Sequence, residues 1–281
     1  MTDSNSVNSY IHITYLDLLI ALALIAIAAA ISRWQRLGME RDMAVGTVRA
    51  FVQLLAVGLV LQQIFNAARW YWVILALAVM TSVAGWNAMQ RQAGPRRGVF
   101  PLMAGAIAIG SALALAIVIG VVLRVRPWYQ PQYVIPIAGM VIGNAMNGAA
   151  LVVGRLRSEI LNRRNEVEAA LALGASARVA SESALREALR AAMVPTINSL
   201  MTVGIVQLPG MMTGQIISGA RPADAVRYQI VVLLMIAAAT AITAMAAGFG
   251  AFSLFFTPAH QISPYMELGR DGGRYRTKCR G

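Results

Sequence analysis

The chain has 281 residues, of which 58% are hydrophobic and only 13% charged, and its mean hydropathy is +0.63. So few polar groups cannot cover a water-soluble domain of this length, so the composition indicates a polytopic membrane protein in a lipid bilayer. The net charge of +12 does not indicate a nucleic-acid partner, because the basic residues fall in short segments between apolar runs. The single cysteine, Cys279, excludes a disulfide framework and a thiolate metal cluster.

Seven apolar runs are each long enough to cross a hydrocarbon core of about 30 Å as a helix. They predict an all-α fold with about seven transmembrane helices in a single domain, residues 14–256. The runs cover residues 14–31, 44–64, 71–89, 99–123, 134–153, 194–218 and 225–249. Residues 1–13 form an N-terminal extension without the basic region of a cleaved secretory signal. The glycine-rich basic tail, residues 257–281, is predicted to be disordered.

The basic residues orient these helices. With the N-terminus outside, 19 of the 24 lysines and arginines lie in cytoplasmic segments or in the tail. The five on the outer side are Arg69, Arg124, Arg126, Arg221 and Arg227. The positive-inside rule therefore predicts an outer N-terminus and a cytoplasmic C-terminus.

The second and fifth spans carry polar residues that need an explanation. In the second span, Arg49 and Gln53 are four residues apart and share one helix face, which makes them candidate structural or gating residues. Arg49 also lies near the cytoplasmic end, where its side chain can extend to the interface, and both readings stay open. In the fifth span, Met140, Asn144 and Asn147 share a face. Amide hydrogen bonds between packed helices and a substrate path are the two alternatives there.

The longest polar segment, residues 155–192, lies between the fifth and sixth spans and is predicted to be mostly helical; we call it the polar segment. Its first part predicts a short helix with Asn165 as N-cap, Glu168 closing a capping box and Gly174 as a left-handed C-cap. The small apolar face of this helix fits either the membrane surface or a groove in another protein. A second helix is predicted from a Ser176 cap through Ala191, with Glu182 and Arg186 four residues apart.

The sixth span is interrupted by the polar stretch of residues 207–215. Pro209 removes a backbone donor and is predicted to free the carbonyl of Ile205, and Gly210 lets the next turn leave helical geometry. Irregular backbone at membrane depth is tolerated only where protein or a cavity shields it. We therefore expect the break to face the interior of the protein, with Asn144 and Asn147 opposite, or to pack against the fifth span as a purely structural kink.

Several functions are excluded or disfavoured by what the spans contain. The only lysine is Lys278, and no Gly-x-x-x-x-Gly-Lys motif occurs, so the chain carries no phosphate-binding loop for ATP. His12 and His260 are isolated, so no hydrolase triad is expected and the chain is predicted not to be an enzyme. No Asp or Glu lies at mid-membrane, so thioethers and amides favour a soft metal, a chelate or a neutral substrate; the metal ligands stay unknown.

Five motifs resemble those of known proteins. Glu168-Ala-Ala-Leu-Ala-Leu-Gly174 resembles the E-A-A…G motif through which permeases of ABC transporters contact their ATPase. The FetB-type ABC permeases resemble this chain over roughly residues 15–256. The stretches that carry this likeness are Gly139-Met-Val-Ile-Gly-Asn-Ala-Met-Asn147, Met193-Val-Pro-Thr-Ile-Asn198, Gln207-Leu-Pro-Gly-Met-Met-Thr-Gly-Gln215 and Arg227-Tyr-Gln-Ile230. Bacterial members of that family are described as iron exporters, and plant relatives are linked to aluminium tolerance.

The resemblance implies the membrane subunit of an ATP-driven exporter of iron or another metal in the inner membrane. It implies a permease homodimer with a separate ATPase that binds ATP and Mg²⁺, while this chain binds no cofactor. The residues expected to couple to the ATPase are Asn165, Glu168, Ala169, Ala170, Leu171 and Gly174. The residues expected along the substrate path are Met140, Asn144, Asn147, Asn198, Gln207, Pro209, Met211, Met212 and Gln215.

Two other functions stay open. A secondary transporter or channel for a small solute is disfavoured, because ion coupling needs ionisable residues at mid-helix. A non-transporting membrane assembly protein is the other alternative, since the number of spans does not distinguish it from a permease.

Overall fold

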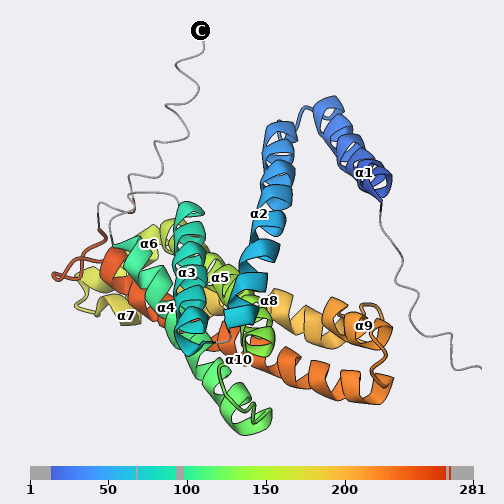
Figure 1. The fold of residues 1–281 in the computed structure, drawn as a ribbon. Coiled ribbons are helices and arrows are strands. Elements are labelled where there is room, and N and C mark those ends of the chain that lie inside the picture. The colour runs from blue at the N-terminus through green and yellow to red at the C-terminus, as the bar shows by residue number, and fades with distance from the viewer. Residues whose placement is uncertain (1–13, 68, 93–97, 264–265, 267–281) are drawn as a thin grey trace, which may run out of the picture. The chain divides into compact units, whose positions relative to one another are not determined.

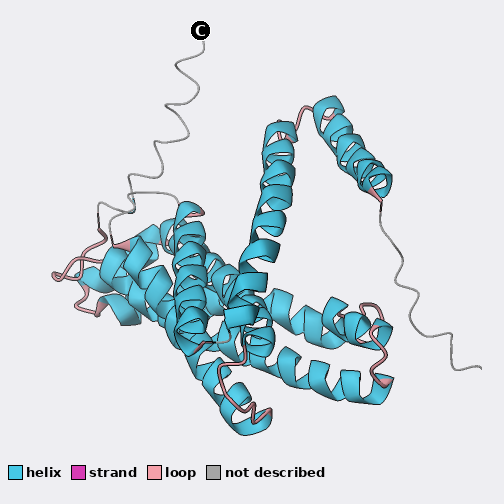
Figure 2. Ribbon diagram, in the orientation of Figure 1, coloured by secondary structure: helices cyan, strands magenta, loops and turns pink. Residues whose placement is uncertain are grey.

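The computed structural model describes residues 14–67, 69–92, 98–263 and 266, and these residues are almost entirely helical (Figures 1 and 2). Within them the only extended pairings are two isolated bridges, Val203 with Gln207 and Phe256 with Ile262. The all-α prediction is confirmed. The N-terminal extension and most of the basic tail lie outside the described residues.

Six of the described helices are long and apolar enough to cross a membrane, which confirms a polytopic membrane protein. They are α1 (Tyr15–Trp34), α2 (Glu40–Ala67), α3 (Trp70–Gln90), α4 (Val99–Ile117) with the π-helix η1 (Val118–Val122), α5 (Pro131–Asn162) and α10 (Pro222–Phe255). The remaining predicted span, residues 194–218, is divided. It comprises the end of α8 (Glu182–Thr202), a break at residues 203–209, and the short helix α9 (Gly210–Ile217).

The chain divides into two compact units, and the first of them, residues 1–68, contains α1 and α2. Ser32 holds the turn between these helices: its hydroxyl donates to the Glu40 carboxylate (3.3 Å) and accepts from the backbone N–H of Met39 (3.2 Å). Large apolar side chains such as Leu24, Leu54 and Leu55 are exposed along both helices. Exposed apolar faces of this kind are suited to contact with lipid.

The second unit, residues 69–281, is a bundle in which α10 packs along α4, α5 and α8 (Figure 1). α5 also contacts α3, α4 and α8, so α5 and α10 form the centre of the bundle. Their packing relies on small residues. A Cβ added to Gly110 of α4 would lie 2.8 Å from the carbonyl oxygen of Ala239 on α10, so the two backbones are nearly in contact. Such close approach is typical of helix packing in membranes.

The polar segment differs from the prediction at several boundaries. α5 continues to Asn162, and the next helix, α6 (Arg164–Ala172), begins one residue before the predicted N-cap. The second predicted helix is two elements: α7 (Ala177–Ala180), capped by Ser176 as expected, and α8. Because α8 runs without interruption from Glu182 to Thr202, the helix that starts in the polar segment also forms the first part of the predicted sixth span.

Part of the predicted disordered tail folds back on this unit. Ser263 donates its backbone N–H to the Phe255 carbonyl (2.8 Å), and buried Arg157 of α5 donates to the Met266 carbonyl (3.0 Å). His260 Nδ1 accepts the backbone N–H of Ala177 at the start of α7 (3.3 Å). The prediction of disorder from residue 257 therefore does not hold for residues 257–263.

Candidate functional site

A cavity of about 260 Å³ lies between α5, α8 and α10, with the break at residues 203–209 completing its wall. Each helix contributes one stripe of residues spaced three or four apart, as expected for one helix face. The lining residues are Asn144, Asn147, Gly148 and Leu151 of α5; Ala192, Pro195, Thr196 and Ser199 of α8; Val203, Gln207 and Pro209 of the break; and Gln229, Leu233, Ile236 and Thr240 of α10.

The closest approach between α5 and α10 at this cavity is made possible by a glycine. A Cβ added to Gly148 would lie 2.7 Å from Thr240 Cγ2, which is closer than real Cβ atoms approach a neighbour. Both residues are buried. Gly148 therefore lets α5 lie against Thr240, and this contact forms one side of the cavity.

Two residues that line the cavity each have a buried oxygen without a hydrogen-bond partner among the described residues. Gln229 is 8% exposed and Thr240 is 2% exposed, yet Gln229 Oε1 and Thr240 Oγ1 have no hydrogen-bond partner in the described structure. Leaving a buried polar group unsatisfied costs about 1–3 kcal/mol, so such groups usually have a role or a missing partner. Because both residues line the cavity, a ligand bound there is placed to supply the partner when either side chain rotates toward it.

The asparagines of the cavity are held differently. Asn144 donates its side-chain amide to the Met140 carbonyl one turn earlier on α5 (2.8 Å), which leaves its Oδ1 available. Asn147 Oδ1 accepts from Arg91 Nη1 of the segment that follows α3 (2.8 Å). The described lining residues include no Asp, Glu, Lys, Arg or His, so Arg91 brings positive charge to the cavity only through Asn147.

The break has a defined geometry. α8 ends at Thr202, whose carbonyl accepts from the backbone N–H of Val206 (2.9 Å). Gly204 adopts a left-handed conformation (φ +85°) and donates to the Gln207 carbonyl (2.9 Å), which closes a tight loop. Pro209 then precedes the first residue of α9, Gly210. The predicted kink at Pro209 is thus wrong in detail: the helix has already ended at Thr202, and Gly210 starts a helix instead of loosening one.

A second candidate site is α6 and the turn that follows it. Val167 is 3% exposed and fixes this helix to the protein, while Leu173 directly after the helix is 90% exposed. Gly174 is left-handed (φ +89°), its N–H donates to the Leu171 carbonyl, and the Ala175 N–H donates to the Ala170 carbonyl (both 3.0 Å). This pair of bonds is a Schellman motif, so the predicted glycine C-cap is present.

The predicted capping box at the start of α6 is wrong. Arg163 is the N-cap, without a side-chain cap bond, and Asn165 lies inside the first turn. Glu168 pairs instead with Arg164 (2.6 Å), because a cation one turn earlier on the same face satisfies its carboxylate. The predicted pair of Glu182 and Arg186 is present at 2.9 Å.

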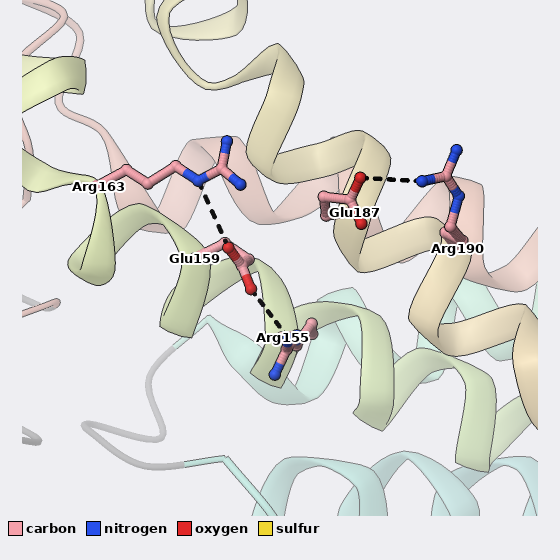
Figure 3. A network of polar contacts seen from close by, with 5 residues as sticks. All are labelled: Arg155, Glu159, Arg163, Glu187 and Arg190. Atoms are coloured by element: carbon pink, nitrogen blue, oxygen red, sulfur yellow. Dashed lines mark hydrogen bonds and ion pairs between the residues drawn. The ribbon is translucent and has the colours of Figure 1, made fainter.

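Ion pairs between residues three or four positions apart recur along the polar segment (Figure 3). Near the end of α5, Glu159 lies between Arg155 (3.1 Å) and Arg163 (3.6 Å), and the Glu159 side chain is largely buried. On α8, Glu187 pairs with Arg190 (3.1 Å). These carboxylates are compensated within the chain itself.

A family model described as "Uncharacterised protein family (UPF0014)" matches residues 15–256. The chain belongs to this family. The UPF0014 membrane protein STAR2 of Oryza sativa subsp. japonica is 40% identical over 243 residues, covering 86% of this chain and 84% of the relative. Protein ALUMINUM SENSITIVE 3 of Arabidopsis thaliana is 39% identical over 246 residues, covering 88% and 89%.

A bacterial relative of this UPF0014 protein is the Probable iron export permease protein FetB of Escherichia coli (strain K12), which is 34% identical over 251 residues, covering 89% of this chain and 95% of the relative. The resemblance inferred from the four motifs is therefore confirmed. No solved structure matches the chain.

The predicted path residues of this UPF0014 protein divide into two groups. The structure brings Asn144, Asn147, Gln207 and Pro209 to the cavity. Five other predicted residues lie on neighbouring positions of α5, α8 or α9 and do not line it: Met140, Asn198, Met211, Met212 and Gln215. Arg49 and Gln53 lie in the other unit, exposed along one shallow groove of α2.

Four polar lining residues were not predicted as path residues: Thr196, Ser199, Gln229 and Thr240. Their spacing held a signal. Gln229 and Thr240 are eleven residues apart, which is about three helical turns and places them on one face of a long apolar helix. Thr196 and Ser199 are three apart on α8. Polar residues on one face of an apolar helix indicate a buried polar surface.

Proposed function

We propose that this UPF0014 protein is the permease subunit of an ABC-type exporter that moves iron, another metal or a metal complex across the inner membrane. A separate P-loop ATPase hydrolyses ATP, and two permease copies assemble with it. The observation that carries the proposal is the similarity, over most of both chains, to a protein named a probable iron export permease. The uncharged polar cavity among three packed helices supports it, because transporters place substrate sites at interrupted helices inside the membrane.

The experiment measures transport in inverted membrane vesicles that contain this chain and a candidate P-loop ATPase, with radioactive iron outside. Export in the cell corresponds to uptake into these vesicles. We expect uptake with ATP and none when the phosphate-binding lysine of the ATPase is replaced. Uptake that ignores ATP and follows an imposed proton gradient would instead establish a secondary transporter.

The proposed path runs through the cavity. In a Cys279→Ser background, a single cysteine at Gln207 is expected to react with an aqueous thiol reagent and to be protected by substrate. Cysteine at Met211 serves as the control, since this residue lies four positions on, in α9, outside the cavity. Equal behaviour of the two cysteines would mean that the cavity is packing and not a path.

We propose that α6 with its glycine turn contacts the ATPase and that the polar segment is cytoplasmic. The contact with the ATPase is supported by the burial of Val167, which anchors α6, and by the exposure of Leu173 directly after the helix. Reporter fusions after Arg97 and after Gly281 test the orientation, because both positions are then cytoplasmic. A signal from the opposite side at either position would contradict the topology.

A further inference from the structure

Resting on the proposed function, we propose that the cavity binds an uncharged ligand through hydrogen bonds, and that a metal passes through it only when enclosed in an uncharged organic complex. A bare divalent or trivalent metal ion is then not the form that is transported.

The first ground is the chemistry of the lining. Hard multivalent cations are bound by carboxylates together with other oxygens, and these charges compensate for the lost hydration shell. The described residues around the cavity offer amides and hydroxyls but no carboxylate, and the described part of the chain holds no group of three or more His, Cys, Asp or Glu suited to a metal ion. An ion transferred here would lose its water without a compensating charge.

The second ground is the pair of unsatisfied buried atoms. Gln229 and Thr240 both line the cavity, while the Gln229 Oε1 and Thr240 Oγ1 atoms have almost no accessible surface and no hydrogen-bond partner among the described residues. When either side chain rotates toward the cavity, a ligand with hydroxyl or amide groups supplies the missing hydrogen bond, which requires no net charge. Arg91 reinforces the preference, since its guanidinium donates to Asn147 and repels an approaching cation.

The third ground is the apolar remainder of the lining. Leu151, Leu233 and Ile236 lie on the same helix faces as the polar residues. This alternation suits an organic molecule that has both polar groups and an apolar rim. A hydrated ion presents only polar surface and gains nothing from contact with these side chains.

The test uses the full chain in lipid nanodiscs without ATPase or ATP, and measures binding by equilibrium dialysis. The probes are radioactive iron as the uncharged 3:1 maltol complex of iron(III), and free Fe²⁺ under reducing conditions. We expect saturable binding of the maltol complex and none of Fe²⁺ at matched concentration.

Substitutions locate the binding. Thr240→Val keeps the shape of the side chain but removes the hydroxyl, and we expect about tenfold weaker binding of the maltol complex, in line with the loss of one buried hydrogen bond. Thr240→Ser keeps the hydroxyl and should lose less. Thr243→Val is the matched control: Thr243 is also buried and unpartnered on α10 but does not line the cavity, so its substitution should leave binding unchanged.

Gln229→Glu separates the two substrate classes by the sign of its effect. If the cavity bound a bare cation, a carboxylate in place of the amide would strengthen that binding; if it binds an uncharged complex, the carboxylate weakens it. We expect weaker binding of the maltol complex and still no binding of Fe²⁺.

Any of four results would overturn the inference. They are binding of Fe²⁺ to the unmodified chain, tighter binding of the maltol complex after Gln229→Glu, an equal loss of maltol-complex binding in Thr240→Val and Thr243→Val, and binding of neither probe. The proposed function is judged separately. ATP-driven uptake of free Fe²⁺ would contradict this inference but support the proposed exporter. Binding of the complex without any ATP-driven uptake would support this inference but contradict the proposed exporter.

Discussion

The polar segment and the cavity differ in whether their polar side chains have partners. In the polar segment, Glu159, Glu168, Glu182 and Glu187 each have an arginine within 4 Å. At the cavity, the more deeply buried oxygens of Gln229 and Thr240 have no hydrogen-bond partner among the described residues. Both regions share α5 and α8, whereas the two unsatisfied oxygens of the cavity lie on α10, which packs against both helices.

This difference in pairing indicates which region stabilises the fold and which region binds a ligand. Charges paired within one stretch of helix need nothing from outside, and exposed pairs contribute little to stability. Unsatisfied neutral groups inside a membrane bundle are a cost that the fold retains. We therefore expect changes in the polar segment to alter coupling or stability, and changes in the cavity to alter the substrate.

The largest effect is expected from filling the contact beside the cavity. Gly148→Val places a branched side chain where even a Cβ would lie 2.7 Å from Thr240 Cγ2, so α5 and α10 must separate. Overpacking of this kind costs roughly 1–3 kcal/mol and should lower the thermal unfolding midpoint and abolish transport. Gly143→Val on the same helix is the control, because no described atom outside the backbone of its own helix turn lies within 4 Å of its added Cβ. Equal losses from both would place the cause in helix propensity and not in the α5–α10 contact.

The second effect concerns the turn after α6. Gly174→Val forces a branched residue into the left-handed conformation, at a cost of about 1–2 kcal/mol, and should redirect the chain that leaves the proposed docking helix. We expect normal membrane insertion but reduced stimulation of the ATPase. Gly174→Asn is the matched control, since asparagine tolerates this conformation. Full stimulation by the valine variant would count against docking by α6.

The features that could be predicted from the sequence are local ones. Length and composition identify six of the spans, and the glycine turn at Gly174 and the pair of Glu182 with Arg186 depend on residues within a few positions of each other. The capping box failed for a local reason as well: the motif allowed Glu168 two partners, and Arg164 rather than the backbone binds it.

The cavity could be predicted only in part, because it depends on contacts between distant helices. Asn144 and Gln207 were predicted from their polar motifs. Thr240 lies beside the cavity because it contacts Gly148, more than ninety residues earlier in the chain. No pattern within either helix links these two positions. The continuity of α8 through Pro195 was missed for a similar reason: the change from polar to apolar composition near residue 193 indicated a boundary that the backbone does not have.

The third effect is the loss of stability when the largely buried carboxylate of Glu159 is removed. Glu159→Gln keeps the size of the side chain but removes the charge that two arginines share (Figure 3). The arginine side chains are partly exposed, so solvent screens the loss to roughly 1 kcal/mol, seen as a lower unfolding midpoint. An unchanged midpoint would mean that the network does not hold the end of α5.

The smallest effect is expected for Glu182→Gln, which removes an ion pair in which both side chains are more than half exposed. Such a pair on a helix contributes about 0.2–0.5 kcal/mol, and salt screens it. We expect a change in unfolding midpoint well below that of Glu159→Gln and no change at all at high salt.

Glu182 nevertheless lies with Arg178 and Phe249 around a surface groove of the polar segment. If its substitution leaves stability intact and still reduces ATPase stimulation, the partner contacts this groove as well as α6. If stability falls as far as in Glu159→Gln, the distinction between paired charges that are buried and those that are exposed fails in this protein.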